Sequence, residues 1–350
     1  MDSNGVESES EKGILAEARV ARSSHVKPTP PSLVSRMLSR MTSMVRGGLW
    51  LTRAGGLRQR LDQREHIDNQ RWAELNARLE SLTHIAWMGS HRAEEIDTRL
   101  RSRCQVFGQN MFIDPGDSIV SPFLLRDGYF EPFETAVMES AIKPGDVVLD
   151  IGANIGYYTL IFAKLVGEQG KVYAFEPDPS NFALLKKNVR ANGYRNVICV
   201  PKAVSDVAGP LSLFLCPDNK GDHRIYSSED TRATVGIEAL RLDDYFADYE
   251  GVINFVKMDI QGSESRALRG MVGLLRSHPE AKLVTEFWPG GIRRCGDSGR
   301  DYLDSLEGLG FHLLHIDEET ETCSPVSAGE LLALYPGDDE RFGNLFCVRA

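Results

Sequence analysis

The sequence predicts an α/β fold, a mostly parallel sheet with helices on both faces, preceded by a helical N-terminal extension. Two observations support this prediction. From residue 147 onward, short apolar runs rich in β-branched residues alternate with helical patterns, as in repeated strand–helix units. The first unit, residues 146–159, joins an apolar strand to a helix through a tight loop that contains two glycines.

The first 105 residues differ in composition from the remainder of the 350-residue chain. They hold 17 basic and 13 acidic residues, a net charge of +4, whereas the remainder has a net charge of −14. An acidic body lacks the basic footprint that phosphate backbones require, so we expect no nucleic-acid partner. Residues 1–31 are polar and end in a proline-rich run, which predicts a disordered tail. We therefore divide the chain into 1–31, a helical region 32–105 and a catalytic domain 106–350.

The helical region has two amphipathic parts, and the role of each stays open. Apolar residues recur at helical spacing over 32–50 among arginines, which is typical of a helix on an anionic membrane surface or of one that docks on protein. Residues 58–103 show short heptad spacing, which indicates either a coiled-coil dimer or a long helix packed on its own chain. Peripheral membrane contact or dimerisation through residues 32–103 is the resulting hypothesis.

Targeting and metal signals are absent from the sequence. No apolar run approaches the roughly 20 residues of a membrane span, and the first residues do not form a secretory signal. The six cysteines have no metal-ligand spacing, which predicts reduced, mostly buried thiols. We expect a cytoplasmic protein, with peripheral membrane attachment as the open alternative, and no metal.

The catalytic domain begins with a bridge over 104–145. Short strands are expected at 107, 111–113 and 119–120, with a turn at 114–117, followed by a helix over 135–141. The pattern then predicts strands at 147–151, 171–176, 196–200, 237–242, 252–260, 281–287, 310–316 and 344–349, and helices at 156–166, 179–192, 263–276 and 300–308. A turn at 202–204 and a polar excursion over 216–236 interrupt this alternation.

The glycine loop after the first strand predicts a nucleoside-like ligand. A phosphate-binding loop needs only glycines and N–H donors, whereas here an acid, Asp150, stands at the loop entrance. That acid indicates a ligand with positive charge or hydroxyls, which favours S-adenosylmethionine over a dinucleotide. Glu176 ends the next strand, 20 residues after Gly156, where a carboxylate accepts hydrogen bonds from ribose hydroxyls. The predicted cofactor-binding residues are Asp150, Gly152, Ala153, Asn154, Gly156, Thr159, Glu176, Ala203 and Asp259.

A second motif, residues 256–264, supplies candidate catalytic residues. Lys257 and Asp259 are two apart on a strand and share a face, with Asp259 at its carboxyl end. A carboxylate there stabilises a sulfonium and takes or orients a proton; a buried structural ion pair is the alternative. Glu264 is a catalytic candidate or a helix first-turn acid, behind a possible Ser263 cap. Glu286 ends another strand, as a ligand contact or a rim carboxylate.

The polar loop 218–224 lies between strands and has the composition of an acceptor-recognition element. Its His223 is a candidate acid or base, although a lone loop histidine is more often only exposed. We place the acceptor pocket around 218–224 and 286–291.

These motifs together resemble the FkbM-type S-adenosylmethionine-dependent methyltransferases over about 118–349. The similarity rests on Val-Leu-Asp-Ile-Gly-Ala-Asn-Ile-Gly-Tyr-Tyr-Thr (148–159), Phe-Glu-Pro-Asp-Pro (175–179) with Asn188, Leu-Asp-Asp-Tyr-Phe (242–246), Val-Lys-Met-Asp-Ile-Gln-Gly-Ser-Glu (256–264) and Asn-Leu-Phe-Cys-Val-Arg (344–349). The resemblance implies a Rossmann-like class I methyltransferase sheet of seven strands, the last antiparallel. It also implies methyl transfer to a hydroxyl of a sugar, glycan or natural product. Gln261 departs from the family, which usually has glutamate there.

The sequence thus predicts an S-adenosylmethionine-dependent O-methyltransferase acting on a small-molecule or glycan acceptor. The loop 150–156 would hold the methionine end of the cofactor, Glu176 the ribose, and the turn at Ala203 the adenine. Asp259 would lie between cofactor and acceptor, steadied by Lys257. Two alternatives remain: a non-catalytic cofactor-binding scaffold tethered through its N-terminal helices, and a nicotinamide-dependent oxidoreductase, which would instead need Gly-x-Gly-x-x-Gly.

Overall fold

The computed structural model describes residues 103–227, 232–337 and 340–349, which belong to one compact unit. The predicted tail, basic amphipathic helix and heptad segment lie outside the described residues. Within the described ranges, no helix is both long enough and apolar enough to cross a membrane.

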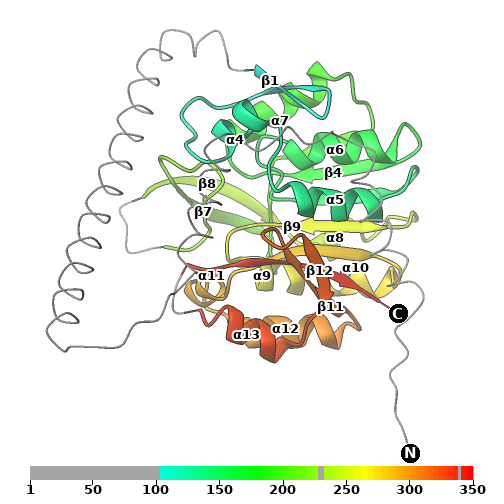
Figure 1. The fold of residues 1–350 in the computed structure, drawn as a ribbon, viewed down its shortest axis with the longest axis vertical. Coiled ribbons are helices and arrows are strands. Elements are labelled where there is room, and N and C mark those ends of the chain that lie inside the picture. The colour runs from blue at the N-terminus through cyan, green and yellow to red at the C-terminus, as the bar shows by residue number, and fades with distance from the viewer. Residues whose placement is uncertain (1–102, 228–231, 338–339, 350) are drawn as a thin grey trace, which may run out of the picture. The chain divides into compact units, whose positions relative to one another are not determined.

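An eight-stranded sheet forms the centre of the unit, as Figure 1 shows. Its strand order is β12-β11-β13-β10-β9-β3-β4-β5. The bounds are β3 (Val147–Ile151), β4 (Lys171–Phe175), β5 (Val197–Val200), β9 (Phe255–Met258), β10 (Lys282–Phe287), β11 (His312–Asp317), β12 (Thr322–Pro325) and β13 (Gly343–Val348). The five strands from β5 to β10 pair in parallel, whereas β13 is antiparallel to both of its neighbours.

This order confirms the predicted fold class. Seven strands form the Rossmann-like methyltransferase sheet with an antiparallel final strand, and β12 adds an antiparallel edge beyond β11. The chain reverses its winding direction between β3 and β9, because β4 and β5 lie on one side of β3 and all later strands lie on the other. Ligands of open α/β sheets bind at such a switch point, beyond the carboxyl ends of the strands.

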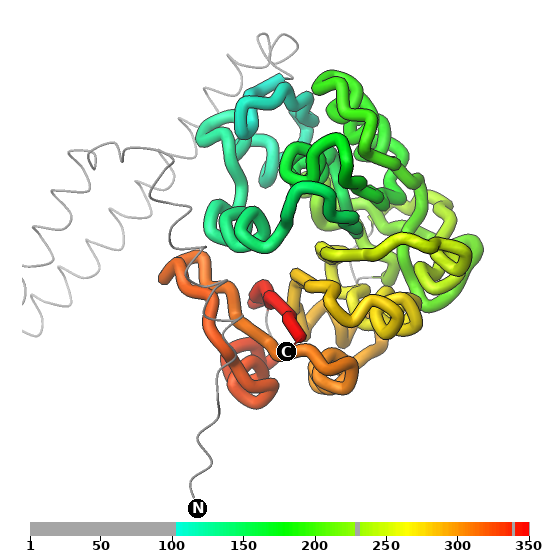
Figure 2. The backbone as a smooth tube through the Cα atoms, turned by 90° about the vertical axis from the view of Figure 1, so that its right-hand side faces the viewer, coloured from blue at the N-terminus to red at the C-terminus, as the bar shows by residue number. Residues whose placement is uncertain are grey.

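Helices cover both faces of the sheet, as Figures 1 and 2 show. Alternate strand residues point to opposite faces: Val148 joins one hydrophobic cluster, and Leu149 and Ile151 join the other. The first cluster includes residues of α4 (Val120–Asp127), α5 (Pro132–Ala141), α6 (Tyr157–Val166) and α7 (Pro179–Ala191). The second includes residues of α8 (Leu242–Tyr245), α9 (Glu264–Arg269), α10 (Val272–Ser277), α11 (Pro289–Arg294), α12 (Gly299–Gly308) and α13 (Ala328–Leu334).

Two smaller sheets accompany the main one. A hairpin, β1 (Arg103–Val106) with β2 (Gln109–Phe112), precedes α4. A three-stranded sheet of order β6-β8-β7 contains β6 (Ala203–Val204), β7 (Gly209–Leu215) and β8 (Ala233–Leu240). This second sheet carries the polar loop 216–224.

The structure corrects several predicted elements. The expected strand at 119–120 is instead the start of α4, and the expected turn at 202–204 contains the short strand β6. The expected continuous helix over 263–276 is broken into α9 and α10 at Gly270. A Cβ atom there would lie 2.0 Å from the Ser205 carbonyl oxygen, so two backbone segments meet at that glycine. No element was predicted for β7, and the first part of β8 was assigned to the polar excursion over 216–236.

Candidate active site

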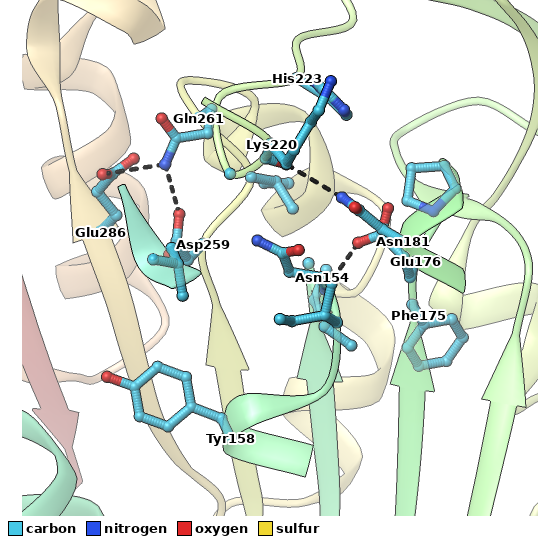
Figure 3. A pocket seen from close by; sticks show the side chains of 18 of the residues that line it. Asn154, Tyr158, Phe175, Glu176, Asn181, Lys220, His223, Asp259, Gln261 and Glu286 are labelled. Atoms are coloured by element: carbon cyan, nitrogen blue, oxygen red, sulfur yellow. Dashed lines mark hydrogen bonds between the residues drawn. The ribbon is translucent and has the colours of Figure 1, made fainter. Parts of the chain in front are cut away.

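A cavity of about 300 Å³ opens beyond the carboxyl ends of β3, β4 and β9. Figure 3 shows Asn154 near its middle, with Glu176 and Asn181 on one side and Asp259 and Glu286 on the other. Its wall contains nine of the residues named above: Gly152, Ala153, Asn154, Glu176, Ala203, His223, Lys257, Asp259 and Glu286. The structure therefore brings together residues that are up to 134 positions apart in the chain, from Gly152 to Glu286.

The backbone N–H groups of the glycine loop are already hydrogen-bonded within the protein. The N–H groups of Gly152 and Ala153 both donate to the Phe175 carbonyl oxygen at 3.0 Å. The Asn154 N–H donates to a Glu176 carboxylate oxygen at 2.8 Å, and the Gly156 N–H donates to the Ala153 carbonyl oxygen at 2.8 Å. A phosphate-binding loop needs such donors free for the ligand. The loop therefore lies beside a ligand as a rigid support and does not form an anion-binding site.

Gly152 is required where the loop meets the strand that carries Asp259. Its φ is +84°, and a Cβ atom would lie 2.0 Å from the Asp259 carbonyl oxygen. We expect Gly152→Ala to lower the free energy of unfolding by about 2–4 kcal/mol, since left-handed strain and backbone overlap add. Urea unfolding measures this loss.

Gly145→Ala is the matched control for that prediction. Gly145 has a φ of +91°, but an added Cβ atom would meet nothing within 4 Å. Only the left-handed strain applies there, so the expected loss is about 1–2 kcal/mol. Equal losses in the two variants would contradict the proposed close contact at Gly152.

Asp150, Gly156 and Thr159 do not line the cavity, which corrects their predicted direct contact with a ligand. Asp150 is fully buried and accepts a hydrogen bond from the Thr159 hydroxyl. It also stands opposite Lys257 in the β3–β9 register. An added Cβ atom at Gly156 would meet the Leu185 side chain at 2.8 Å, so that glycine lets α6 and α7 pack closely. These three residues support the loop from behind.

Glu176 occupies the predicted position at the end of β4. Its two carboxylate oxygens accept from the N–H groups of Asn154 and Asp178, both at 2.8 Å. Burial raises the pKa of Glu176 to about 8, although both N–H donors oppose that shift. A buried carboxylate at the cavity wall gains from hydrogen-bond donors supplied by a ligand.

Lys257 and Asp259 form the predicted pair, with the Lys257 ammonium 3.2 Å from a carboxylate oxygen of Asp259. Lys257 is 3% exposed, and its ammonium also lies 4.7 Å from the centre of the Tyr158 ring. Burial lowers the pKa of Lys257, but carboxylates led by Asp259 and Asp150 outweigh it and raise that pKa overall. The lysine is therefore a buried cation, paired with Asp259 at the cavity wall.

Gln261 lies between two acids, Asp259 and Glu286. Its side-chain amide donates to Asp259 at 2.8 Å and reaches Glu286 at 3.4 Å, as the dashed lines in Figure 3 show. Its backbone has a φ of 55°, which turns the chain into the cavity. A glutamate here would add a third carboxylate to the pair, so the departure from the family changes the local charge.

Glu264 has the second of its two predicted roles, as an acid in the first turn of α9, whereas Ser263 does not cap that helix. Glu264 does not line the cavity; it is buried and accepts from the Ile260 N–H at 2.9 Å, which closes the turn after β9. Burial raises the pKa of Glu264 to about 7. Ser263 precedes α9 but makes no side-chain cap hydrogen bond. Both residues shape the turn that presents Asp259 and Gln261.

Sequence reasoning missed the contribution of the segment before α5. Tyr157 and Tyr158 of α6 hold this segment: Tyr157 accepts from the Phe130 N–H at 3.0 Å and donates to the Phe130 carbonyl oxygen at 2.7 Å. The Tyr158 hydroxyl donates to the Glu131 carboxylate at 2.7 Å. Glu131 lines the cavity, and burial raises its pKa to about 7. The only sequence signal was an acid directly before a proline that begins a helix.

The polar loop comes from the second sheet and lines the cavity with Lys220 and His223. The Asn181 side-chain amide donates to the Lys220 carbonyl oxygen at 3.0 Å, which ties the loop to α7. His223 is half-buried at the wall and accepts at Nδ1 from the Cys216 N–H at 3.1 Å. Burial lowers the pKa of His223, so the ring is neutral with its proton on Nε2. The hydrogen bond between His223 and Cys216 joins the two ends of the polar loop.

The fold is that of a Rossmann-like methyltransferase domain. Residues 150–313 match the family described as the Methyltransferase FkbM domain. The match confirms, over that part of the chain, the resemblance drawn from the motifs.

Relatives of known name share this region. The 31-O-demethyl-FK506 methyltransferase FkbM of Streptomyces tacrolimicus is 33% identical over 37% of this chain and 61% of its own length. The hexuronic acid methyltransferase AglP of Haloferax volcanii is 32% identical over 46% of this chain and 64% of its own. The chain therefore spans less than two thirds of the length of these relatives.

Among solved structures, a methyltransferase FkbM from Methylobacillus flagellatus is 16% identical, with a TM-score of 0.35 over 61% of this chain and 50% of that one. This similarity is too low to bear on function.

Proposed function

We propose that the chain is an S-adenosylmethionine-dependent methyltransferase that transfers the methyl group to a hydroxyl of its acceptor. The observation that carries the proposal is the pairing of Glu176 and Asp259 across one cavity, on either side of the loop 152–154. One carboxylate suits the ribose hydroxyls of a nucleoside, and the other suits a sulfonium.

The wall residues fit such a cofactor on two further counts. The Asn154 side-chain oxygen is buried and has no hydrogen-bond partner among the described residues, so it is available to a ligand donor. The loop N–H groups are used internally, which disfavours the pyrophosphate of a dinucleotide and hence the oxidoreductase alternative. Ala203, in β6 after β5, also lines the cavity and would contact the adenine end.

The residues of the chain would act mainly by positioning and by electrostatics. A bound S-adenosylmethionine supplies an electrophilic methyl group on a sulfonium. Glu176 and the loop 152–154 orient the nucleoside, and Asp259, fixed by Lys257 and Gln261, stabilises positive charge near the reacting atoms. As the acceptor oxygen bonds to the methyl carbon, the carbon–sulfur bond breaks and the hydroxyl proton passes to a wall carboxylate.

The cofactor site can be tested through the pH dependence of binding. Below pH 8 the ligand-free Glu176 carboxyl holds a proton, whereas ribose hydroxyls donate to the ionised form. Binding should therefore release a proton, and the affinity for S-adenosylmethionine should rise from pH 6 and level off above about pH 8. Calorimetry in buffers of different ionisation enthalpy measures both effects. Glu176→Gln should weaken binding about 10–100-fold at pH 8 and remove the step near that pH.

Asp178→Asn is the control for this experiment. Its N–H still donates to Glu176, and asparagine can still cap α7 as Asp178 does. The affinity of this variant should stay within about threefold of wild type. If Glu176→Gln binds the cofactor as wild type does, the ribose assignment is wrong; if wild type binds none, the proposed function is wrong.

Turnover distinguishes an enzyme from a scaffold. Purified protein is incubated with trideuteromethyl S-adenosylmethionine and an extract of its own cells, and labelled product is sought by mass spectrometry as a gain of about 17 mass units, the 14 of a methyl group plus the three of the label. Cofactor binding without any labelled product would favour the scaffold tethered through residues 32–103.

A further inference from the structure

We propose that Glu131 and Glu286 form the acceptor subsite of the cavity, and that it takes neutral or amino-bearing polyols while rejecting carboxylated and phosphorylated ones. This inference rests on the proposed function, because it concerns the half of the cavity that the nucleoside wall leaves open. Glu131 precedes α5 and Glu286 ends β10, and both line the cavity with Asp259.

Each carboxylate oxygen of Asp259 already accepts one hydrogen bond. Lys257 bonds one oxygen at 3.2 Å and the Gln261 amide bonds the other at 2.8 Å. The acceptor would therefore find further hydrogen-bond partners in the neighbouring side chains. Glu131 and Glu286 are the remaining carboxylates of the described wall on this side of the loop.

One carboxylate oxygen of Glu286 can accept a hydrogen bond from a ligand. The side chain is 5% exposed, and its Oε2 has no hydrogen-bond partner among the described residues. Its Oε1 receives only the long 3.4 Å contact from Gln261. A buried carboxylate with an empty acceptor position is destabilised until a hydroxyl or an ammonium group reaches it. Figure 3 shows this carboxylate at the edge of the cavity, across from Asn154.

Glu131 is held in place for a similar contact. The Tyr158 hydroxyl fixes one of its oxygens, and its backbone adopts a left-handed conformation with a φ of 44°. Such a conformation is unfavourable for a residue with a side chain, and it persists where surrounding contacts enforce it, often at functional sites. The Tyr157 contacts with Phe130 supply that enforcement.

The charge balance on this side excludes an anionic acceptor. Lys257 is committed to Asp259 and to the Tyr158 ring. Of the two other lysines of the described wall, Lys202 follows β5, and the backbone carbonyl oxygen of Lys220 accepts from Asn181, which lies with Glu176 on the nucleoside side. A carboxylate or phosphate on the acceptor would face the Glu131 and Glu286 carboxylates. Hydroxyls and ammonium groups would instead complete their hydrogen bonds.

Burial raises the pKa of Glu131 to about 7 and that of Glu286 well above its ordinary value. Donors or a cation from the acceptor would offset this cost of burial, as they would for any desolvated acid.

The first test uses sinefungin, which carries an amine in place of the S-methyl group, against S-adenosylhomocysteine, which has a neutral sulfur there. Calorimetry at pH 7.5 should show sinefungin binding at least about tenfold more tightly in wild type. Glu286→Gln and Glu131→Gln should each reduce this ratio about threefold or more. The control is Glu134→Gln, a buried acid of α5 that does not line the cavity, and it should keep the wild-type ratio.

Failure of the inference and failure of the proposed function give different results. The proposed subsite is wrong if wild type does not prefer sinefungin, or if Glu286→Gln and Glu131→Gln both keep the wild-type preference. In either case, binding of S-adenosylhomocysteine would still support the cofactor site. Loss of S-adenosylhomocysteine binding in wild type overturns the proposed function. A variant that fails to bind S-adenosylhomocysteine is replaced by Glu131→Asp or Glu286→Asp, which should shift the ratio less than glutamine does.

The second test compares methyl glycosides of glucosamine, glucose and glucuronic acid as probes of the S-adenosylhomocysteine complex by ligand-observed NMR. The amino sugar and the neutral sugar should bind at least about tenfold more tightly than the glucuronide, and Glu286→Gln should narrow that gap. If the glucuronide binds most tightly, the proposed rejection of anionic acceptors is wrong. If none of the three glycosides binds, the proposed preference for polyols is wrong.

Discussion

Asp259→Asn is expected to slow methyl transfer by about 10²–10³-fold while leaving the fold intact. The Asp259 carboxylate accepts from both Lys257 and Gln261, which hold it in place at the cavity wall. Asparagine keeps the size and one acceptor oxygen and removes the negative charge. Single-turnover transfer from labelled S-adenosylmethionine to an acceptor that wild type methylates measures the loss.

Asp206→Asn controls for the removal of a paired aspartate elsewhere. Asp206 forms ion pairs with Arg266 and Arg269 outside the cavity wall, so its replacement should leave transfer within about twofold of wild type. Cofactor affinity of Asp259→Asn should fall less than its transfer rate. A variant that binds poorly but transfers normally once saturated would show that Asp259 serves binding alone.

Lys257→Met is expected to lower the free energy of unfolding by about 3–5 kcal/mol, because it leaves a buried carboxylate without its counter-ion. The effect should be large since four acids act on this single ammonium: Asp259, Asp150, Glu134 and Glu131. Urea unfolding followed by circular dichroism measures it. Lys171→Met, at an exposed position of the neighbouring strand β4, should change stability by less than about 0.5 kcal/mol.

The loss in Lys257→Met should grow with pH. In the folded variant the buried acids keep their protons to higher pH than in the unfolded chain, where an ordinary glutamate has a pKa near 4.5. Lys257 lowers the pKa of Glu131 in the wild type, so its removal raises that pKa above about 7. Wild-type Glu131 ionises at about pH 7 and the variant only at higher pH, so the loss relative to wild type should grow as pH rises through and above 7. A pH-independent loss would show that packing, not charge, explains the defect.

The sequence was most informative where the signal is local. The strand 147–151, the glycine loop and the acid at Glu176 could all be predicted, because apolar alternation and turn residues reflect short-range geometry. The end of β8 was predicted as a strand over 237–242, whereas β7 and the start of β8 were missed because they are half-exposed and lack a continuous apolar run.

The candidate site was predictable in its nucleoside half and not in its acceptor half. Glu131 precedes Asp259 by more than a hundred residues, and only the packing of α5 and α6 brings the two to one wall. The burial of Asp150 behind the loop likewise depends on its Thr159 and Lys257 neighbours, which a strand pattern does not reveal. Tertiary contacts decide which strand-end acids reach a ligand.

The contact between Gly152 and the Asp259 carbonyl oxygen joins the two halves of the cavity mechanically. With no side chain between them, the loop cannot shift toward β9 without moving the residue that faces the acceptor. Cofactor binding on the nucleoside side would thus fix the geometry of the acceptor side before the acceptor binds. Steady-state kinetics should accordingly follow a compulsory order, with the cofactor binding before the acceptor and leaving last as its demethylated product.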